Sequence, residues 1–531
     1  MFVVKLRRFI STNAVKRTAE AVSASKRDDY YKNLGGATES NEKPLDWDGA
    51  MPYESIPGPK PLPVIGNLWR FLPYIGEYYN VPLVPLYKSL KERYGDILIL
   101  RGLGRKPMVV LFDVNDIEKN FRNEGSFPLR RGMESFTHYR TVTKKDLFQG
   151  ATGVLTVQGE EWFKFRSTVN PILMQPRAVQ QYVGSMDKVA SELVDNIRFF
   201  STQNEKGEMP GDFENELYKW ALESIGVVAL DKHLGCLNLN APKDSEPQRL
   251  ISNVNEMFRI MYKLDVLPPI WKFIETPTWK KYVSILDSIT ETTMKYTEES
   301  LNKTIEEDIP EHKLSVLQRL AKQNKKIAIT MVMDMLMAGI DTTGKTLGAA
   351  LYFLARNPDK QERLREEVFK NLPNKDSTVT KEALNQSPYL KAVIKETTRI
   401  APIAIGNVRT SVKDMVLGGY QIPKGTEIIT LNIITANSEE FKDHEKFIPE
   451  RWLRSTVDEY SHKKAHPFAY LPFGFGPRSC IGKRFANLEV EVALSKVIRN
   501  FELSWPHEDM VFSGKFLYGI DGPLKLNVKP L

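Results

Sequence analysis

The sequence predicts a mainly α-helical protein that contains a small mixed β-sheet. Apolar residues recur at helical spacing from about residue 160 onward, which is the pattern of amphipathic helices. Strand-like apolar runs gather in two places, within residues 96–112 and 416–434. Hydrophobic residues make up 42% of the 531 positions, which is enough for a large buried core. This length is compatible with several domains or with one long domain.

The amino-terminal segment, residues 1–27, is basic and carries apolar residues at helical spacing. Glu20 is its single acid, and Ser and Thr recur through it. This composition is typical of a mitochondrial transit peptide. A secretory or membrane anchor needs about 18 consecutive apolar residues, and Lys5, Arg7 and Arg8 interrupt any such run here. A solvated basic tail is the remaining alternative.

Residues 28–54 are polar and are predicted to form a linker. The following stretch, Ile56–Pro63, is rich in proline, which fixes φ and favours a stiff, extended lead into a folded domain. A ligand for an SH3-type domain is the alternative, which the position just before a folded domain disfavours. Most of the formal net charge of +8 lies in residues 1–27. The nearly neutral remainder does not indicate nucleic-acid binding.

The two strand-like groups are broken by turn residues. Residues 96–100 and 107–112 are joined by a glycine-containing turn. Residues 416–434 are interrupted by Gly418-Gly419 and by Pro423-Lys424-Gly425. We therefore expect short strands in both groups.

A long apolar helix is predicted from about Ile327 to Leu354, and it contains the run Ala338-Gly339-Ile340-Asp341-Thr342-Thr343. A glycine inside a helix costs about 0.5–1 kcal/mol relative to alanine, so its presence suggests that something requires space. A threonine hydroxyl can bond back to the carbonyl one turn earlier and open the helix. The alternative is an ordinary helix with one tolerated glycine and two surface threonines.

A ten-residue run near the carboxyl end, Phe473–Gly482, places Cys480 in a glycine-spaced loop, two residues after Arg478. An amphipathic stretch, Ala486–Val497, follows it. Glycines let the backbone approach a metal, and a following helix is expected to lower the thiol pKa with its positive end. A single thiolate ligand to a haem iron needs this arrangement. Alternatively, Cys480 packs as a small apolar residue, as we expect of the other cysteine, Cys236.

These two runs resemble the signatures of the cytochrome P450 family, the haem-thiolate monooxygenases. Residues 473–482 match FxxGxRxCxG and residues 338–343 match AGxDTT at every defined position. The resemblance extends from about residue 55 to the end. It implies one triangular domain of P450 fold over residues 55–531, with haem b as cofactor and Cys480 as the metal ligand.

The resemblance also assigns roles to individual residues. Thr342 and Asp341 are the expected catalytic residues, because they supply the hydrogen bond and the protons for cleavage of the O–O bond, and Gly339 makes room for dioxygen. The expected cofactor-binding set consists of Trp162, Arg166, Gly339, Arg409, Phe473, Arg478 and Cys480. Arginine suits the haem propionates because its fork can bond both carboxylate oxygens.

A second set of residues is expected to be structural. Glu396 and Arg399 lie one helical turn apart, and alone this spacing usually marks a solvated pair. Downstream, residues 449–452 read Pro-Glu-Arg-Trp and resemble a further family segment. Together with Arg451, the pair is predicted to form a buried charge network.

Surface lysines indicate an electron-transfer partner. Lys391 and Lys395 lie at i and i+4, and Lys483 and Arg484 follow the cysteine loop. The first two match the pair with which mitochondrial members dock an acidic, adrenodoxin-like [2Fe–2S] ferredoxin. Ordinary solvated lysines are the alternative. The resemblance, which is greatest to insect mitochondrial members, implies a location in the mitochondrion, on the matrix side of the inner membrane.

The predicted function is therefore a mitochondrial monooxygenase. It takes electrons from NADPH through ferredoxin reductase and ferredoxin, and inserts one oxygen atom into a lipophilic substrate, either a xenobiotic or a steroid such as an ecdysteroid. A non-catalytic haem-thiolate sensor or carrier is the alternative, and a helical interaction protein with an inert Cys480 is another.

Residues 264–279 mix apolar and aromatic side chains with lysines and prolines. The stretch is too short to span a bilayer. Peripheral membrane association and core packing are both consistent with it.

Overall fold

The structure is a computed structural model that describes residues 43–63, 65–102, 106–149, 151–267, 269–305, 314–514 and 516–531. The predicted transit peptide, residues 1–27, and the first part of the predicted linker lie outside the described residues. The described end of that linker contacts residues 420 and 421 of a β-strand. Met51 bridges to Tyr420, and Trp47, which is buried, accepts a hydrogen bond from Gln421 Nε2 at 2.9 Å.

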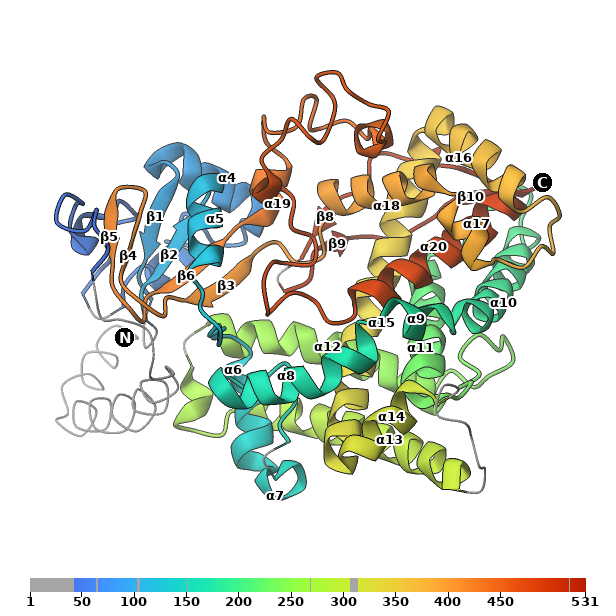
Figure 1. Cartoon of the computed structure of the whole chain (residues 1–531), viewed down its shortest axis with the longest axis horizontal. Coiled ribbons are helices and arrows are strands. Elements are labelled where there is room, and N and C mark those ends of the chain that lie inside the picture. Colours follow the sequence, from blue (N-terminus) through green and yellow to red (C-terminus); the bar gives the residue numbers. More distant parts are fainter. Residues whose placement is uncertain are drawn as a thin grey trace.

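Helices make up most of the described chain, as the periodicity predicts (Figure 1). The α-helices are α4 (Leu83–Tyr94), α5 (Val114–Arg122), α6 (Glu134–His138), α7 (Lys145–Phe148), α8 (Gly159–Leu173), α9 (Pro176–Gln180), α10 (Val183–Ser201), α11 (Phe213–Leu230), α12 (Glu246–Val266), α13 (Pro277–Ile305), α14 (Val316–Gln323), α15 (Lys325–Arg356), α16 (Pro358–Asn371), α17 (Lys381–Asn385), α18 (Pro388–Ile400), α19 (Asn432–Ala436) and α20 (Lys483–Asn500).

The strands are short, and within the described residues they form one mixed sheet and three two-stranded ones. Their bounds are β1 (Ile97–Leu100), β2 (Met108–Leu111), β3 (Asn407–Thr410), β4 (Met415–Leu417), β5 (Tyr420–Ile422), β6 (Glu427–Thr430), β7 (Phe501–Ser504), β8 (Phe512–Ser513), β9 (Gly519–Ile520) and β10 (Asn527–Pro530). The four-stranded sheet has the order β1-β2-β6-β3, with β2 and β6 parallel and the other two pairs antiparallel. The prediction of a small mixed sheet is confirmed.

The second strand-like group is correct in part. The three strands β4, β5 and β6 lie where the turns predict them, but the group ends at Thr430 and not at Ile434. Residues 432–436 form α19, in which the backbone N–H groups of Ile434 and Thr435 both donate to Leu431 O. A short apolar run is equally suited to a buried strand and to a buried helix. The sequence pattern alone therefore misassigned this piece.

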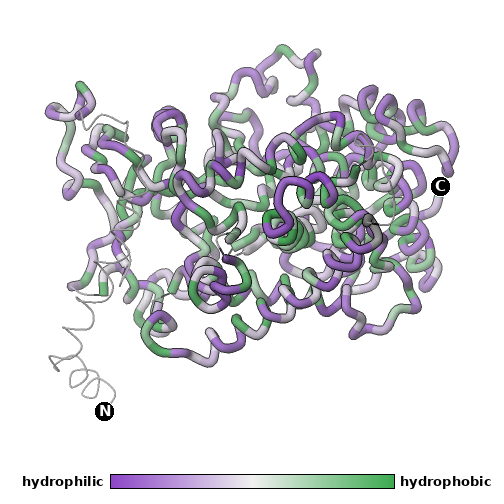
Figure 2. The backbone as a smooth tube through the Cα atoms, turned by 60° about the horizontal axis from the view of Figure 1, so that its bottom comes forward, coloured by the Kyte–Doolittle hydropathy of each residue, from purple (hydrophilic) through white to green (hydrophobic). Residues whose placement is uncertain are grey.

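Most of the helices lie toward one end of the molecule and the four-stranded sheet lies at the other (Figure 1). Figure 1 places the four-stranded sheet with α4 and α5 at one end, while α10, α16, α17 and α20 lie at the other. Figure 2 shows hydrophobic residues concentrated inside the helical end. The largest buried cluster joins α8, α10, α11, α15, α18 and α20, and α15 runs through it.

Helix α15 organises this core. Among the described helices it is the one long and apolar enough to cross a membrane by length and composition, yet 72% of its most apolar window is buried inside the protein. Its neighbours include α11, α14, α18 and α20. The helix therefore packs as the central core element, and it carries the 338–343 run into the middle of the molecule.

Candidate active site

The Cys480 loop is held by its own backbone. The N–H of Cys480 donates to Phe473 O at 2.9 Å, and that of Ser479 donates to Gly476 O at 3.0 Å. Gly476 has φ of +72°, and a Cβ there would lie 2.0 Å from Oε1 of Glu124, so only glycine fits. Helix α20 begins at Lys483, where the amphipathic pattern predicts a helix.

The Cys480 side chain is accessible, although protein atoms surround it densely. Burial raises the pKa of its thiol above the ordinary value, while the N–H groups of Gly482 and Lys483 and the charge of Arg166 act in the opposite direction. The predicted lowering of the Cys480 pKa by the helix end is therefore present, and the effect of burial on this pKa is larger. A bound metal cation would favour the thiolate strongly.

Arginine side chains crowd around this loop. Arg478 is buried, donates through Nε to Pro128 O at 3.0 Å, and lies with its guanidinium carbon 3.9 Å from the Trp162 ring centroid. Arg166 is also buried and donates to Ser479 O at 2.9 Å. The structure thus brings Trp162, Arg166, Arg478 and the Cys480 loop together, as predicted.

Arg409 lies in the same region but is already engaged. Its Nε donates to Oε2 of buried Glu124 at 2.5 Å, and its Nη2 donates to Phe475 O at 3.3 Å. Burial raises the pKa of Glu124, and Arg409 opposes that rise. The pair therefore ties β3 to the cysteine loop, a role that the sequence did not indicate.

Arg130 is a further cation of this group that sequence reasoning missed. Burial lowers its pKa to about 10, and the nearby charges of Arg409 and Arg166 act in the same direction. Burial lowers the pKa of Arg478 to about 8, and Arg130 is the first of the charges that add to the effect. Arg130 follows helix α5 in a loop without periodicity, so no pattern in the sequence marks it.

This arrangement fits a haem group. Trp162 Nε1, Arg166 Nε and Arg478 Nη1 are buried donors without a hydrogen-bond partner among the described residues. A buried donor left unpaired costs about 1–3 kcal/mol, and repulsion among buried guanidinium groups adds to this cost. Two propionate carboxylates would satisfy both the donors and the charges, and the Cys480 thiol would be available as the ligand of the iron.

The 338–343 run lies within α15, which packs against α20. Thr342 is half-buried, and its hydroxyl donates back to Ala338 O at 2.7 Å, as the sequence analysis anticipates. A Cβ at Gly339 would come within 3.0 Å of Cγ1 of Ile225. Close packing of α11 on α15 therefore explains the glycine at this position.

Asp341 is buried and faces other helices. With its amide nitrogen turned toward the carboxylate, Asn255 of α12 donates to Oδ2 of Asp341 at 3.0 Å. Burial raises the pKa of Asp341 to about 6, Lys345 acts to lower it, and Glu214 acts to raise it further. Asp341 belongs to a recognisable run of residues, whereas no pattern in the sequence marks Asn255.

The predicted structural network is confirmed. Glu396 Oε1 accepts from Arg399 Nη2 at 2.8 Å and from Arg451 Nε at 3.0 Å, and all three side chains are fully buried. Trp452 Nε1 donates to Glu396 Oε2 at 2.8 Å. One carboxylate therefore joins α18 to the segment before the cysteine loop.

The four predicted docking cations lie on two helices that pack together, α18 and α20. Lys395 and Arg484 are exposed, while Lys391 and Lys483 are half-buried. Lys395 Nζ lies 5.7 Å from the Trp452 ring centroid. Burial and the neighbouring charge of Lys391 lower the pKa of Lys395.

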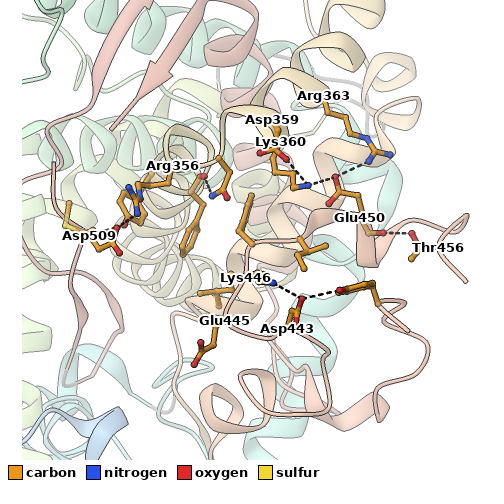
Figure 3. A pocket seen from close by; sticks show the side chains of 18 of the residues that line it. Arg356, Asp359, Lys360, Arg363, Asp443, Glu445, Lys446, Glu450, Thr456 and Asp509 are labelled. Atoms are coloured by element: carbon orange, nitrogen blue, oxygen red, sulfur yellow. Dashed lines mark hydrogen bonds and ion pairs between the residues drawn. The ribbon is translucent and has the colours of Figure 1, made fainter. Parts of the chain in front are cut away.

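A separate cavity of about 1100 Å³ lies between α16, the carboxyl end of α15 and residues 443–460 (Figure 3). Its charged lining residues are mostly paired with one another. Lys360 and Arg363 both contact Glu450, and Arg356 contacts Asp509. None of the predicted site residues lines this cavity.

Comparisons with known proteins agree with this geometry. The cytochrome P450 family model matches residues 56–517. The chain is 41% identical to probable cytochrome P450 12a5, mitochondrial, of Drosophila melanogaster, over 94% of each chain. It is 40% identical to cytochrome P450 CYP12A2 of Musca domestica, over 90% of this chain and 91% of that one.

A third relative, probable cytochrome P450 301a1, mitochondrial, of Drosophila melanogaster, is 37% identical over 91% of this chain and 88% of its own. The loop around Cys480, the buried donors beside it and these matches lead to one conclusion. The chain belongs to the cytochrome P450 family, the haem-thiolate monooxygenases.

Proposed function

We propose that this protein is a mitochondrial P450 that receives electrons from a [2Fe–2S] ferredoxin and oxidises a lipophilic substrate. The observation that carries the proposal is the Cys480 loop, in which an accessible thiol lies near buried guanidinium and indole groups. Trp162 Nε1, Arg166 Nε and Arg478 Nη1 have no hydrogen-bond partner among the described residues. Several relatives carry the word mitochondrial in their names. Together with the basic composition of residues 1–27, this supports placement on the matrix side of the inner membrane.

In this proposal, Cys480 would supply the thiolate ligand of the iron, and Trp162, Arg166 and Arg478 would hold the propionates. Phe473 fixes the cysteine backbone through its carbonyl. When bound, the haem supplies the activation of dioxygen that inserts one oxygen atom into the substrate and reduces the other to water. Arg409, through Glu124, positions the loop.

Two residues of α15 are assigned to proton transfer and hydrogen bonding in the reaction. Asp341 has a raised pKa of about 6, so a carboxyl at this position can both hold and release a proton near neutral pH. Thr342 presents a hydroxyl one residue further along, held by Ala338 O. We assign proton supply to Asp341 and hydrogen bonding at the reacting oxygen to Thr342.

The ferredoxin docking site comprises Lys391, Lys395, Lys483 and Arg484. Mitochondrial P450s generally take electrons from adrenodoxin-like ferredoxins, which are acidic, and complementary charge speeds and orients such encounters. The position of Lys483 and Arg484, directly after Gly482 and at the start of α20, favours this face, because it adjoins the cysteine loop.

Peripheral membrane binding is proposed for the segment between α12 and α13. Ile270, Phe273 and Ile274 are 57%, 59% and 65% exposed, while Trp271 and Trp279 are buried and stack at 4.5 Å. The segment therefore has two buried tryptophans that fix it to the core and an exposed apolar edge. An apolar edge of this kind suits insertion into one leaflet.

The substrate is proposed only as a class, a xenobiotic or a steroid such as an ecdysteroid. A screen of both classes that follows the spin-state shift of the haem on binding distinguishes them. A shift with steroids alone supports hormone metabolism, and a shift with diverse foreign lipophiles supports detoxification.

The central test is a carbon-monoxide difference spectrum of the reduced protein. We expect the red-shifted Soret band of a thiolate-ligated haem in the wild type and its loss in Cys480→Ser. A Cys480→Ser variant that retains haem with an unchanged spectrum would refute the proposal. Wild-type haem binding without substrate-dependent NADPH use would instead favour a sensor or carrier.

A further inference from the structure

With its amide nitrogen turned toward Asp341, Asn255 hydrogen-bonds α12 to the 338–343 run of α15. Its amide nitrogen contacts both oxygens of the Asp341 carboxylate and lies 3.0 Å from Oδ2. Asp341 is 4% exposed, so water has little access to this carboxylate. Asn255 is consequently the main donor that the described residues offer to it.

The other groups facing Asp341 come from α15 and α11. Lys345 lies one turn further along α15 and favours the charged carboxylate, while Glu214 of α11 disfavours it. Tyr218 of α11 donates to Oε1 of Glu214 at 2.5 Å and packs on α15, where a Cβ at Gly344 would meet its ring at 2.7 Å. Asp341 thus lies among Lys345, Glu214, Tyr218, which is hydrogen-bonded to Glu214, and the amide of Asn255.

We propose that Asn255 is a positioning residue that holds the Asp341 carboxylate in its ionised form, so that proton supply at Asp341 depends on the docking of α12 against α15. The proposal rests on the role assigned above to Asp341. An amide N–H is a donor that bonds the charged form of a carboxyl better than the neutral form, and it therefore opposes the effect of burial.

A second contact, close to Asn255 in the sequence, also holds α12 in place. Phe258, one turn after Asn255, stacks on Phe516 with ring centroids 5.5 Å apart and an interplanar angle of 23°. A displacement of α12 away from α15 would separate Asn255 from Asp341. It would also disturb this stack. Asp341 therefore responds to the position of α12 through the amide of Asn255, without moving itself.

The chain offers a matched control on the same helix. Asn253 donates through Nδ2 to Ser288 Oγ of α13 at 3.0 Å and does not face Asp341. Asn255→Leu and Asn253→Leu therefore remove the same chemical group from α12, with only the first affecting the carboxylate. Both are compared in the haem-loaded protein with Asp341→Asn, which identifies the infrared band of the Asp341 carboxyl.

The primary measurement is the pH titration of that carboxyl band. In Asn255→Leu we expect the titration midpoint to rise by about one pH unit, the effect of losing one charge-assisted hydrogen bond. In Asn253→Leu it stays at the wild-type value. The midpoint of the pH dependence of product yield per NADPH shifts in the same direction in Asn255→Leu.

Each outcome is decisive. An unchanged midpoint in Asn255→Leu, or an equal shift in Asn253→Leu, overturns the inference. So does an unchanged yield profile in Asn255→Leu when Asp341→Asn lowers the yield. If Asp341→Asn gives full product yield, the proposed catalytic role of Asp341 fails instead, whatever the titration of Asn255→Leu shows.

Discussion

Thr342 and Thr346 of α15 make equivalent backbone hydrogen bonds, but only Thr342 is proposed to act in the reaction. Its hydroxyl donates to Ala338 O at 2.7 Å, and that of Thr346 makes the equivalent bond to Thr342 O at 2.7 Å. Thr342→Ala is expected to retain haem but to divert electrons into hydrogen peroxide, with product yield per NADPH falling about tenfold or more. Thr346→Ala, the matched control, stays coupled. Full coupling in Thr342→Ala would contradict its role.

The buried carboxyl of Glu489 predicts how the stability of the folded protein depends on pH, and this prediction does not involve the reaction. It is 2% exposed in α20, and burial raises its pKa from 4.5 to about 8, opposed by a hydrogen bond with Thr343. Because the native state holds a proton that the unfolded chain releases above about pH 4.3, stability is lost as the pH rises from there to about 8.

Glu489→Gln should therefore match the wild type near pH 4.5 and be more stable at pH 8.5, by on the order of 5 kcal/mol. Thermal unfolding midpoints measured across this range check the prediction. Glu502→Gln, at an exposed position of β7, is the control. A constant difference between Glu489→Gln and the wild type at all pH values would show that the carboxyl is not held neutral.

Part of the candidate site could be predicted from the sequence motifs alone. Cys480, Trp162, Arg166 and Arg478 lie in short motifs, and the structure brings them together. The Glu124–Arg409 pair spans 285 positions, and neither partner belongs to a motif that names the other. Arg130 and Asn255 were missed for the same reason, because tertiary packing and not local pattern brings them to the site.

At the scale of elements, the lysines of α18 test the docking face. Lys391→Gln with Lys395→Gln should slow ferredoxin-driven turnover about tenfold at low ionic strength and leave substrate binding unchanged. The effect should shrink as salt screens the charges. Stopped-flow reduction and substrate titration measure the two properties.

The matched control is Lys280→Gln with Lys281→Gln on α13, where both side chains are more than half exposed. This pair changes the net charge equally on another helix. Equal slowing in both double variants would mean that net charge, and not the α18 face, governs the encounter.

Elements with a strong period or clear turn residues were predictable. The predicted range Ile327–Leu354 falls within α15, Lys325–Arg356, and β1 and β2 lie inside the predicted strands. The error at α19 arose where a buried apolar run leaves the sheet. There the partner of each N–H decides between helix and strand. Ile434 and Thr435 donate to the nearby Leu431 O, and the apolar pattern does not distinguish this turn from pairing with another strand.

At the scale of the whole molecule, the exposed edge before α13 predicts how tightly the protein holds a bilayer. Ile270→Ser with Phe273→Ser and Ile274→Ser should release the mature protein into the supernatant on carbonate extraction, because each change removes exposed apolar area. The wild type should stay at least partly in the pellet. Full release of the wild type would count against membrane insertion.

The Glu396 carboxylate has a consequence for how the chain can be shortened. Besides Arg399 in its own helix, it accepts from Ile448 N, Arg451 and Trp452, all more than 50 positions downstream. A product of premature termination before Ile448 would lack these three donors, and breaking a buried charge network in this way costs several kcal/mol. Such a fragment would meet cellular proteases as an unstable chain, so a nonsense allele in this region should behave as a null allele and not as a stable haem-free competitor.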